Sequence, residues 1–144
     1  SHTDVIRKSA IAYFGSVKND QNYQRLKDLA KYGGTTWDAR PEAINQLSKY
    51  AKEKPKTLDL FVELLDDNSR SVRRNSVRAL GRYGNKNHVG YLDDVLARDP
   101  IIERSVRAAK KNILSPPKKS GKTNIEKELQ ELNQKIDDIR KIIN

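Results

Sequence analysis

The side chains best able to do chemistry in this sequence are cations in its second half. Seven of them form a possible basic binding strip: Arg74, Arg78, Arg82, Arg104, Arg107, Lys110 and Lys111. Such groups bind phosphates or carboxylates, with an affinity that falls as salt is added. Aromatic side chains that could stack on bases do not alternate with them, and the nearby Tyr83 and Tyr91 are expected to pack in turns. The strip favours a solvated surface or an acidic protein partner, with nucleic acid possible but less favoured.

Three arginines recur at a fixed interval, because Arg7, Arg40 and Arg73 are each 33 residues apart. The nearby upstream acids are Asp4, Asp38 and Asp67, the last followed by the amide of Asn68. A guanidinium can fork two hydrogen bonds to a carboxylate or to the carbonyls of a turn. We interpret this row as structural, and a ligand-binding row is the alternative.

Catalytic and metal-binding patterns are missing from the sequence. There is no cysteine, and the two histidines, His2 and His88, stand far apart without a carboxylate cage. We expect His88 to begin a helix at the surface. Ser120-Gly121-Lys122-Thr123 imitates the end of a phosphate-binding loop, but prolines stand where its first glycine is required. We therefore expect no catalytic, cofactor-binding or metal-binding residue, and no enzyme complete in these residues.

Repeating helices must position these side chains, because the chain superimposes on itself when it is shifted by 33 residues. Four apolar or small positions recur: Ile6, Ala10, Ile11 and Phe14; Ala39, Ala43, Ile44 and Leu47; and Val72, Ser76, Val77 and Leu80. Their steps of four, one and three residues place them on one buried side of a helix. A fourth, incomplete copy around Val106 arrives four residues early. Such a period is typical of stacked helical repeats.

Second helices complete the pairs, and we predict them at 21–32, 56–65 and 87–97. Turn and cap residues separate them, and no segment alternates apolar and polar residues as a half-buried strand would. The predicted fold is all-α, a right-handed α-α superhelix of about three and a half helix pairs. Trp37 is expected to be a packing anchor.

The composition changes after the repeats. Residues 115–123 hold two prolines, a glycine and polar residues, which is typical of a flexible linker. In 124–144 apolar residues follow at alternating steps of four and three: Ile125, Leu129, Leu132, Ile136, Ile139 and Ile143. A parallel pair would bring Lys135 towards Arg140 of its partner, so self-association as an antiparallel pair, or docking on the last repeat, is favoured. The predicted units are a repeat domain (1–114), the linker and this amphipathic helix.

The formal net charge of +10 is unevenly distributed. Acidic residues gather just before the cationic segment 70–86: Asp59, Glu63, Asp66 and Asp67. No run of about 18 apolar residues predicts a membrane helix, and the lack of cysteine fits a reducing compartment. We expect a cytoplasmic protein with no membrane partner. The opening Ser1-His2-Thr3 and the lack of methionine suggest a fragment of a larger protein.

The third copy carries a family resemblance. Val72-Arg73-Arg74 followed by Val77-Arg78-Ala79-Leu80-Gly81, with Leu64-Leu65-Asp66-Asp67 before it, resembles HEAT repeats of the short, phycobilisome-lyase-like kind. The resemblance covers residues 4–114, although the middle copy departs at Pro41, Glu42 and Ser48. With the Glu/Leu-rich segment at 126–132, the combination more narrowly resembles the C-terminal HEAT-like domain of aminopeptidase N-like zinc peptidases.

The resemblance implies roles for these residues. In HEAT-like arrays an arginine row with its acids resembles a ladder between neighbouring repeats, so we expect Arg73→Ala to destabilise the fold by about 1–3 kcal/mol. The peptidase resemblance implies that any zinc belongs to the parent, because H-E-x-x-H is missing here. The leading hypothesis is a non-catalytic structural domain that packs on the parent's own upstream domains. The alternative is a stand-alone scaffold for another protein or, less favoured, nucleic acid.

Overall fold

Helices make up the fold throughout the described residues. The computed structural model describes residues 2–33, 39–115 and 120–143. The α-helices are α1 (His2–Ser16), α2 (Asp20–Tyr32), α3 (Arg40–Ser48), α4 (Thr57–Leu64), α5 (Arg70–Tyr83), α6 (Val89–Arg98), α7 (Glu103–Leu114) and α8 (Ser120–Ile143). Two 3₁₀ helices, η1 (Lys86–His88) and η2 (Pro100–Ile102), flank α6, and these described residues contain no strand.

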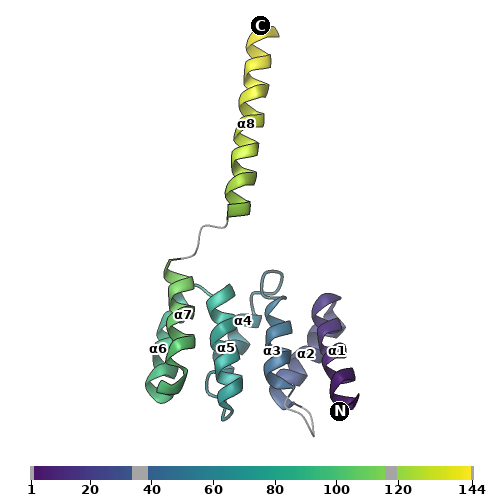
Figure 1. Cartoon of the computed structure of the whole chain (residues 1–144), viewed down its shortest axis with the longest axis vertical. Coiled ribbons are helices and arrows are strands. Elements are labelled where there is room, and N and C mark those ends of the chain that lie inside the picture. The colour runs from purple at the N-terminus through teal and green to yellow at the C-terminus, as the bar shows by residue number, and fades with distance from the viewer. Residues whose placement is uncertain (1, 34–38, 116–119, 144) are drawn as a thin grey trace.

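Helices α1 to α7 form two layers (Figure 1). α1, α3, α5 and α7 lie side by side in one layer, and α2, α4 and α6 make the other. The second helices α2, α4 and α6 each contact the first-layer helix that follows them, and neighbouring first-layer helices contact one another. The predicted all-α fold of three and a half helix pairs is confirmed.

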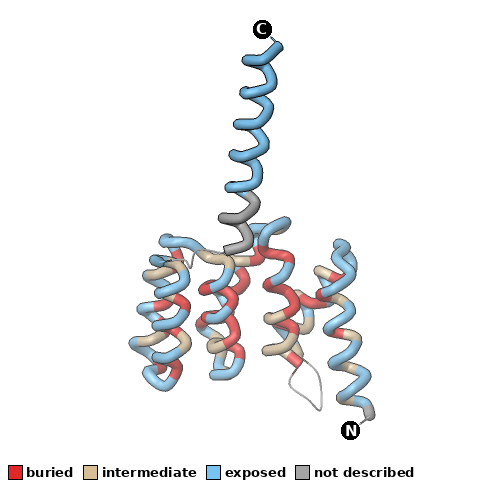
Figure 2. Tube along the Cα trace, turned by 45° about the horizontal axis from the view of Figure 1, so that its top comes forward, coloured by how far each residue is buried: buried red, intermediate tan, exposed pale blue. Residues whose placement is uncertain are grey.

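The buried core follows the predicted repeat. Ile11, Ile44 and Val77 hold the same place in three copies and are buried, as is Val106 in the fourth. Figure 2 shows the buried positions concentrated along α3 and α5. Ile6 was predicted to join this buried stripe, but it is 68% exposed. Because α1 is the first helix of its layer, this side of α1 faces solvent.

The predicted second helices agree with α2, α4 and α6 to within two residues at each end. Local capping fixes these ends; the side chain of Asn19 accepts the backbone N–H of Asn22 at 2.7 Å, just before α2. A capping box forms at η1, where Nδ1 of His88 accepts the N–H of Asn85 at 2.9 Å. His88 is therefore buried, and its predicted surface position was wrong because the ring folds back over the turn.

Helices α5 and α7 approach one another closely at a glycine. A Cβ added to Gly81 would lie 2.7 Å from both Cα and Cβ of Ala109. Real Cβ atoms do not come that close, so lack of space excludes a side chain at this position. The contact fixes the separation of the last two first-layer helices.

The C-terminal helix α8 begins at Ser120, four residues before its predicted start, so 120–123 belong to the helix rather than to the linker. A single glycine in a helix costs only about 1 kcal/mol, so Gly121 does not prevent this extension. Every described side chain of α8, from 126 to 143, is exposed (Figure 2). The helix stands away from the repeats (Figure 1), so it is not docked on the last repeat.

Candidate functional site

The arginine row joins successive repeats. Arg40, at the start of α3, donates from Nε to the carbonyl of Ala30 at 3.0 Å. Its terminal nitrogens donate to the carboxylate of Asp67, with Nη1 3.1 Å from Oδ1. Arg73 on α5 donates to Oδ2 of Asp99 at 2.7 Å and to the carbonyl of Asp67 at 2.7 Å. Arg40 and Arg73 therefore each bind the turn in front of the next first-layer helix.

The remaining residues of the row lie as follows. The upstream acid Asp67 gives Arg73 its carbonyl rather than its carboxylate, and the carbonyl of Asn68 accepts a further bond from Arg73 at 3.0 Å. Arg7 and Asp4 are half-buried on α1. Asp38 lies outside the described residues.

Sequence reasoning missed Asp99, whose carboxylate receives Arg73 and also Nε of Arg70 at 3.1 Å. Asp99 is only 6% exposed. A signal was present, because Asp99 follows Asp67 by 32 residues and stands just before the fourth copy. In that copy the place of Arg73 is taken, 29 residues on, by the buried Ile102, so the row ends there.

The arginines shift the titration of both acids. The hydrogen bond from Arg73 lowers the pKa of Asp99, and Arg70 adds to this effect against burial, which raises it. Burial alone raises the pKa of Asp67, but hydrogen bonds from Arg40 and the Ser69 N–H outweigh it, so the net shift is downward. Groups with a lowered folded-state pKa contribute stability above their unfolded pKa and lose it as the pH falls through the folded pKa.

We therefore expect the melting temperature to fall steeply below about pH 4, where the two aspartates take up protons, and to change little between about pH 5 and 7. The measurement is thermal unfolding followed by circular dichroism across this range. Asp99→Asn should have a lower melting temperature than the parent chain at neutral pH. Its melting temperature should also fall less steeply as the pH is lowered below about 4. If the melting temperatures of the two proteins fell equally steeply at low pH, Asp99 would not be a source of the acid sensitivity.

The predicted basic strip divides into two groups. Arg107 and Lys110 are paired, the first with Glu103 at 2.8 Å and the second with Asp93 of α6 at 2.7 Å. Five cations have no carboxylate partner in the part of the chain that the structure describes: Arg74, Arg78, Arg82, Arg104 and Lys111. The strip is therefore a strongly positive surface on α5 and α7.

Part of the strip borders a shallow groove between α5 and α7, of about 290 Å³. Arg78, Arg82 and Arg104 line it, and the close contact of Gly81 with Ala109 lies among the lining residues. The other lining side chains are small or polar, so the groove offers charge without a large apolar anchor.

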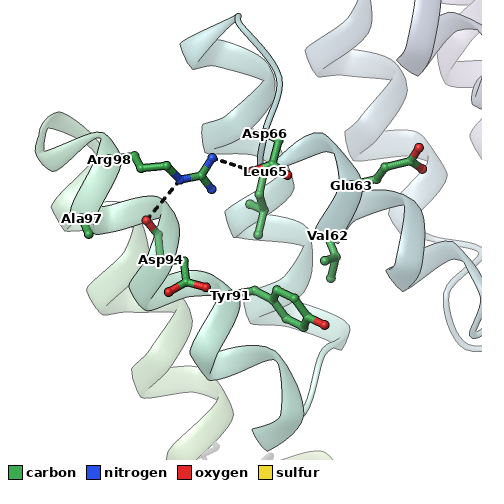
Figure 3. A pocket seen from close by; sticks show the side chains of 8 residues that line it. All are labelled: Val62, Glu63, Leu65, Asp66, Tyr91, Asp94, Ala97 and Arg98. Carbon is green, nitrogen blue, oxygen red and sulfur yellow. Dashed lines mark hydrogen bonds and ion pairs between the residues drawn. The ribbon is translucent and has the colours of Figure 1, made fainter.

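The other layer carries a different groove, between α4 and α6 (Figure 3). Two adjoining hollows of about 570 and 460 Å³ share Val62 and Tyr91, and we call them together the α4–α6 groove. Leu58 and Leu65 add apolar lining. Tyr91 is 50% exposed, and Figure 3 shows its ring reaching from α6 towards Val62 of α4. The prediction that Tyr91 packs in a turn was wrong, because it lies on α6 beside the buried stripe.

Acidic side chains surround the α4–α6 groove. Asp66 pairs with Nη1 of Arg98 at 2.5 Å, and Nε of Arg98 donates to the carbonyl of Asp94 at 3.4 Å (Figure 3). The carboxylates of Asp59, Glu63 and Asp94 have no cationic partner among the residues described. The groove thus combines apolar lining, concentrated in the hollow beside Leu65, with a negative rim.

The acidic segment before residue 70 could be recognised in the sequence, but its proximity to Tyr91 could not be predicted from it. Residues 59–66 and Tyr91 are about 30 positions apart and come together only because α4 and α6 are neighbours. No set of three or more histidine, cysteine, aspartate or glutamate side chains in the described ranges could hold a metal ion. Among the described helices, none combines the length and apolar character needed to cross a membrane.

Residues 31–110 match the family model for HEAT repeats. The chain belongs to the HEAT-repeat family. The match runs from the end of α2 into α7, so both arginine sites and the α4–α6 groove lie within it. HEAT repeats generally bind proteins and are typically non-catalytic. Neither the curated proteins nor the solved structures gave a match, so the narrower resemblance of this HEAT-repeat array to aminopeptidase N-like enzymes gains no support.

Proposed function

We propose that this chain is a non-catalytic HEAT-repeat scaffold that binds a segment of a partner protein in the α4–α6 groove. The carrying observation is the half-exposed Tyr91 over apolar lining, next to carboxylates without a cationic partner in the described structure. Tyrosine is enriched among residues that dominate protein–protein binding, because it offers a large apolar face with a polar tip.

The chemistry of the groove specifies its partner. Val62, Leu65 and the Tyr91 ring favour an apolar side chain, which would displace water from this lining. Glu63 and Asp94 favour a lysine or arginine beside that side chain, since opposite charges steer and orient the partner. The proposed ligand is therefore a protein segment with an apolar residue flanked by basic residues.

Selection from a display library of random linear peptides against the full chain tests this proposal. We expect enriched peptides to pair an apolar residue with lysine or arginine, and Tyr91→Ala to weaken their binding at least about tenfold. Tyr32→Ala is the matched control, because Tyr32 is 80% exposed but lies at the end of α2. Calorimetry or fluorescence anisotropy on one selected peptide measures both variants.

Charge reversal gives a second, independent readout. Glu63→Lys should weaken binding of a basic peptide and reduce its dependence on salt. Failure to enrich any peptide, or equal affinities for the parent chain and Tyr91→Ala, would refute the groove as the binding site. Peptides rich in acidic residues, and sensitive to Arg78→Glu instead, would transfer the function to the basic strip.

The basic strip supports a weaker alternative. Its five cations without a carboxylate partner in the described structure suit an acidic protein segment, which was one of the two sequence-based expectations for this face, the other being a solvated surface. Nucleic acid stays less favoured, since the groove between α5 and α7 lacks an aromatic platform for bases. If the chain bound a nucleic-acid duplex with an affinity that fell steeply as salt was added, nucleic acid would become the favoured ligand of the strip.

An aminopeptidase N-like parent stays a prediction that rests on the Leu64-Leu65-Asp66-Asp67 motif and the α5 sequence. In that case the same helices would pack on upstream domains of the parent, which would hold the zinc. Reading the coding sequence upstream for H-E-x-x-H tests it.

A further inference from the structure

Helix α8 presents an apolar face that nothing covers in the described structure. Leu129, Leu132, Ile136 and Ile139 are 40–55% exposed, although they are among the largest apolar side chains of the chain. Most helices in proteins owe their stability to the packing of an apolar face rather than to their own helix propensity. A partner for α8 is therefore expected on energetic grounds.

The spacing of these residues identifies the kind of partner. Steps of three and four residues make a narrow seam along the helix, the pattern that packs against a second helix in a coiled coil. The opposite side carries polar residues such as Gln130 and Gln134. The seam therefore fits another helix whose apolar residues have the same spacing. The α8 helix of a second copy of this chain is such a helix.

Charges beside the seam distinguish the two orientations. In a parallel in-register pair, Lys135 of each chain would lie beside Arg140 of the other, which gives two repulsive contacts. In an antiparallel pair with Leu132 opposite Ile136, Glu126 of each chain lies beside Arg140 of the other, which gives two attractive contacts. Only one like-charge contact, between the two Lys135 side chains, remains at the centre.

We propose that two copies of this chain associate through an antiparallel coiled coil of their α8 helices, with Leu132 of each opposite Ile136 of the other. The outer face of α7 is a poorer partner, because Arg104, Arg107 and Lys111 make it charged. The dimer carries two α4–α6 grooves, but it does not depend on the function proposed for them.

Sedimentation equilibrium of the full chain over a range of concentrations tests the association. We expect a monomer–dimer equilibrium, weakened at least about tenfold by Ile136→Asp, which places a charge in the seam. Gln134→Asp adds the same charge on the polar side and should leave the equilibrium unchanged. A chain that is monomeric at every concentration, or a dimer that Ile136→Asp does not weaken, overturns the proposal. Loss of the dimer on Ile6→Asp alone would assign the interface to α1.

Disulfide trapping tests the orientation, because the chain has no cysteine of its own. In the antiparallel pair residue 129 of one chain lies opposite residue 139 of the other, and the two copies of residue 129 are about 15 Å apart along the helix. A disulfide needs Cα atoms within about 7 Å. A mixture of Leu129→Cys and Ile139→Cys chains should therefore cross-link, and neither variant alone should. Cross-linking of each variant with itself would show a parallel pair and refute the model of pairing.

A charge exchange completes the test. Arg140→Glu should weaken the dimer by several-fold, because it replaces two attractive contacts with Glu126 by two repulsive ones. Adding Glu126→Arg to the same chain should restore the association. A double variant that stays as weak as the single one would contradict the proposed register.

Discussion

Replacing Gly81 with alanine is expected to lower the free energy of unfolding by about 2–3 kcal/mol. The new Cβ would lie 2.7 Å from Cα and Cβ of Ala109, and both atoms are fixed to the backbone of α7. No change of rotamer can relieve the overlap, so α5 and α7 must move apart. Their shared core then loses contacts along the length of both helices.

Gly90→Ala is the matched control, because a Cβ at Gly90 meets no atom within 4 Å. Alanine is the better helix former, so this change should stabilise the chain by up to about 1 kcal/mol. Urea unfolding followed by circular dichroism should therefore shift in opposite directions for the two variants. Adding Ala109→Gly to Gly81→Ala should recover only part of the loss, because the Cα of residue 109 stays within 2.7 Å of the new Cβ. Equal stability of Gly81→Ala and the parent chain would mean that the helices separate without cost.

The repeat pattern predicted most of the fold, because a period of 33 residues constrains local structure and packing together. Ile11, Ile44 and Val77 were matched by spacing alone, and all three are buried. The prediction that Ile6 is buried was wrong, because periodicity cannot distinguish an inner helix from the first helix of a layer. Its side chain meets solvent where its counterpart Val72 meets a neighbouring helix.

The candidate site was less predictable because it depends on contacts between different repeats. The cations of the strip share one helix or an obvious repeat position, so spacing could group them. The α4–α6 groove instead joins Tyr91 to residues of α4, and the second helices are less alike in sequence than the first helices. Asp99 was missed for a similar reason, since the shorter last repeat shifts it out of the 33-residue register.

Arg73→Ala is expected to lower the free energy of unfolding by about 2–3 kcal/mol. The guanidinium of Arg73 is half-buried and holds a carboxylate and two turn carbonyls, all within 3.0 Å. Its Nε has no hydrogen-bond partner among the described residues, so part of its donor capacity contributes nothing. Without the side chain, Asp99 keeps only Arg70, which is half exposed and holds it less firmly.

Arg74→Ala is the control, because it removes the same side chain one position along α5, where no carboxylate is paired with it in the described structure. It should change stability by no more than about 0.5 kcal/mol. Arg73→Lys keeps the charge but not the fork, so it should fall between the two variants. Chemical unfolding at pH 7 measures the stability of all three variants. Equal stability of Arg73→Ala and Arg74→Ala would contradict a structural role for Arg73.

The size of the Arg73 effect follows from its place in a connected chain of hydrogen bonds. The carbonyl of Ala30 binds Arg40, Arg40 binds the carboxylate of Asp67, and the carbonyl of Asp67 binds Arg73. Arg73 then reaches Asp99 in front of the last first-layer helix. Without Arg73 the carboxylate of Asp99 is held to α5 by Arg70 alone, so the loss of stability should be greatest in the last repeat. Hydrogen exchange should accordingly speed up in α6 and α7 more than in α1 and α2; a uniform change across all helices would contradict a connection that runs through Arg73.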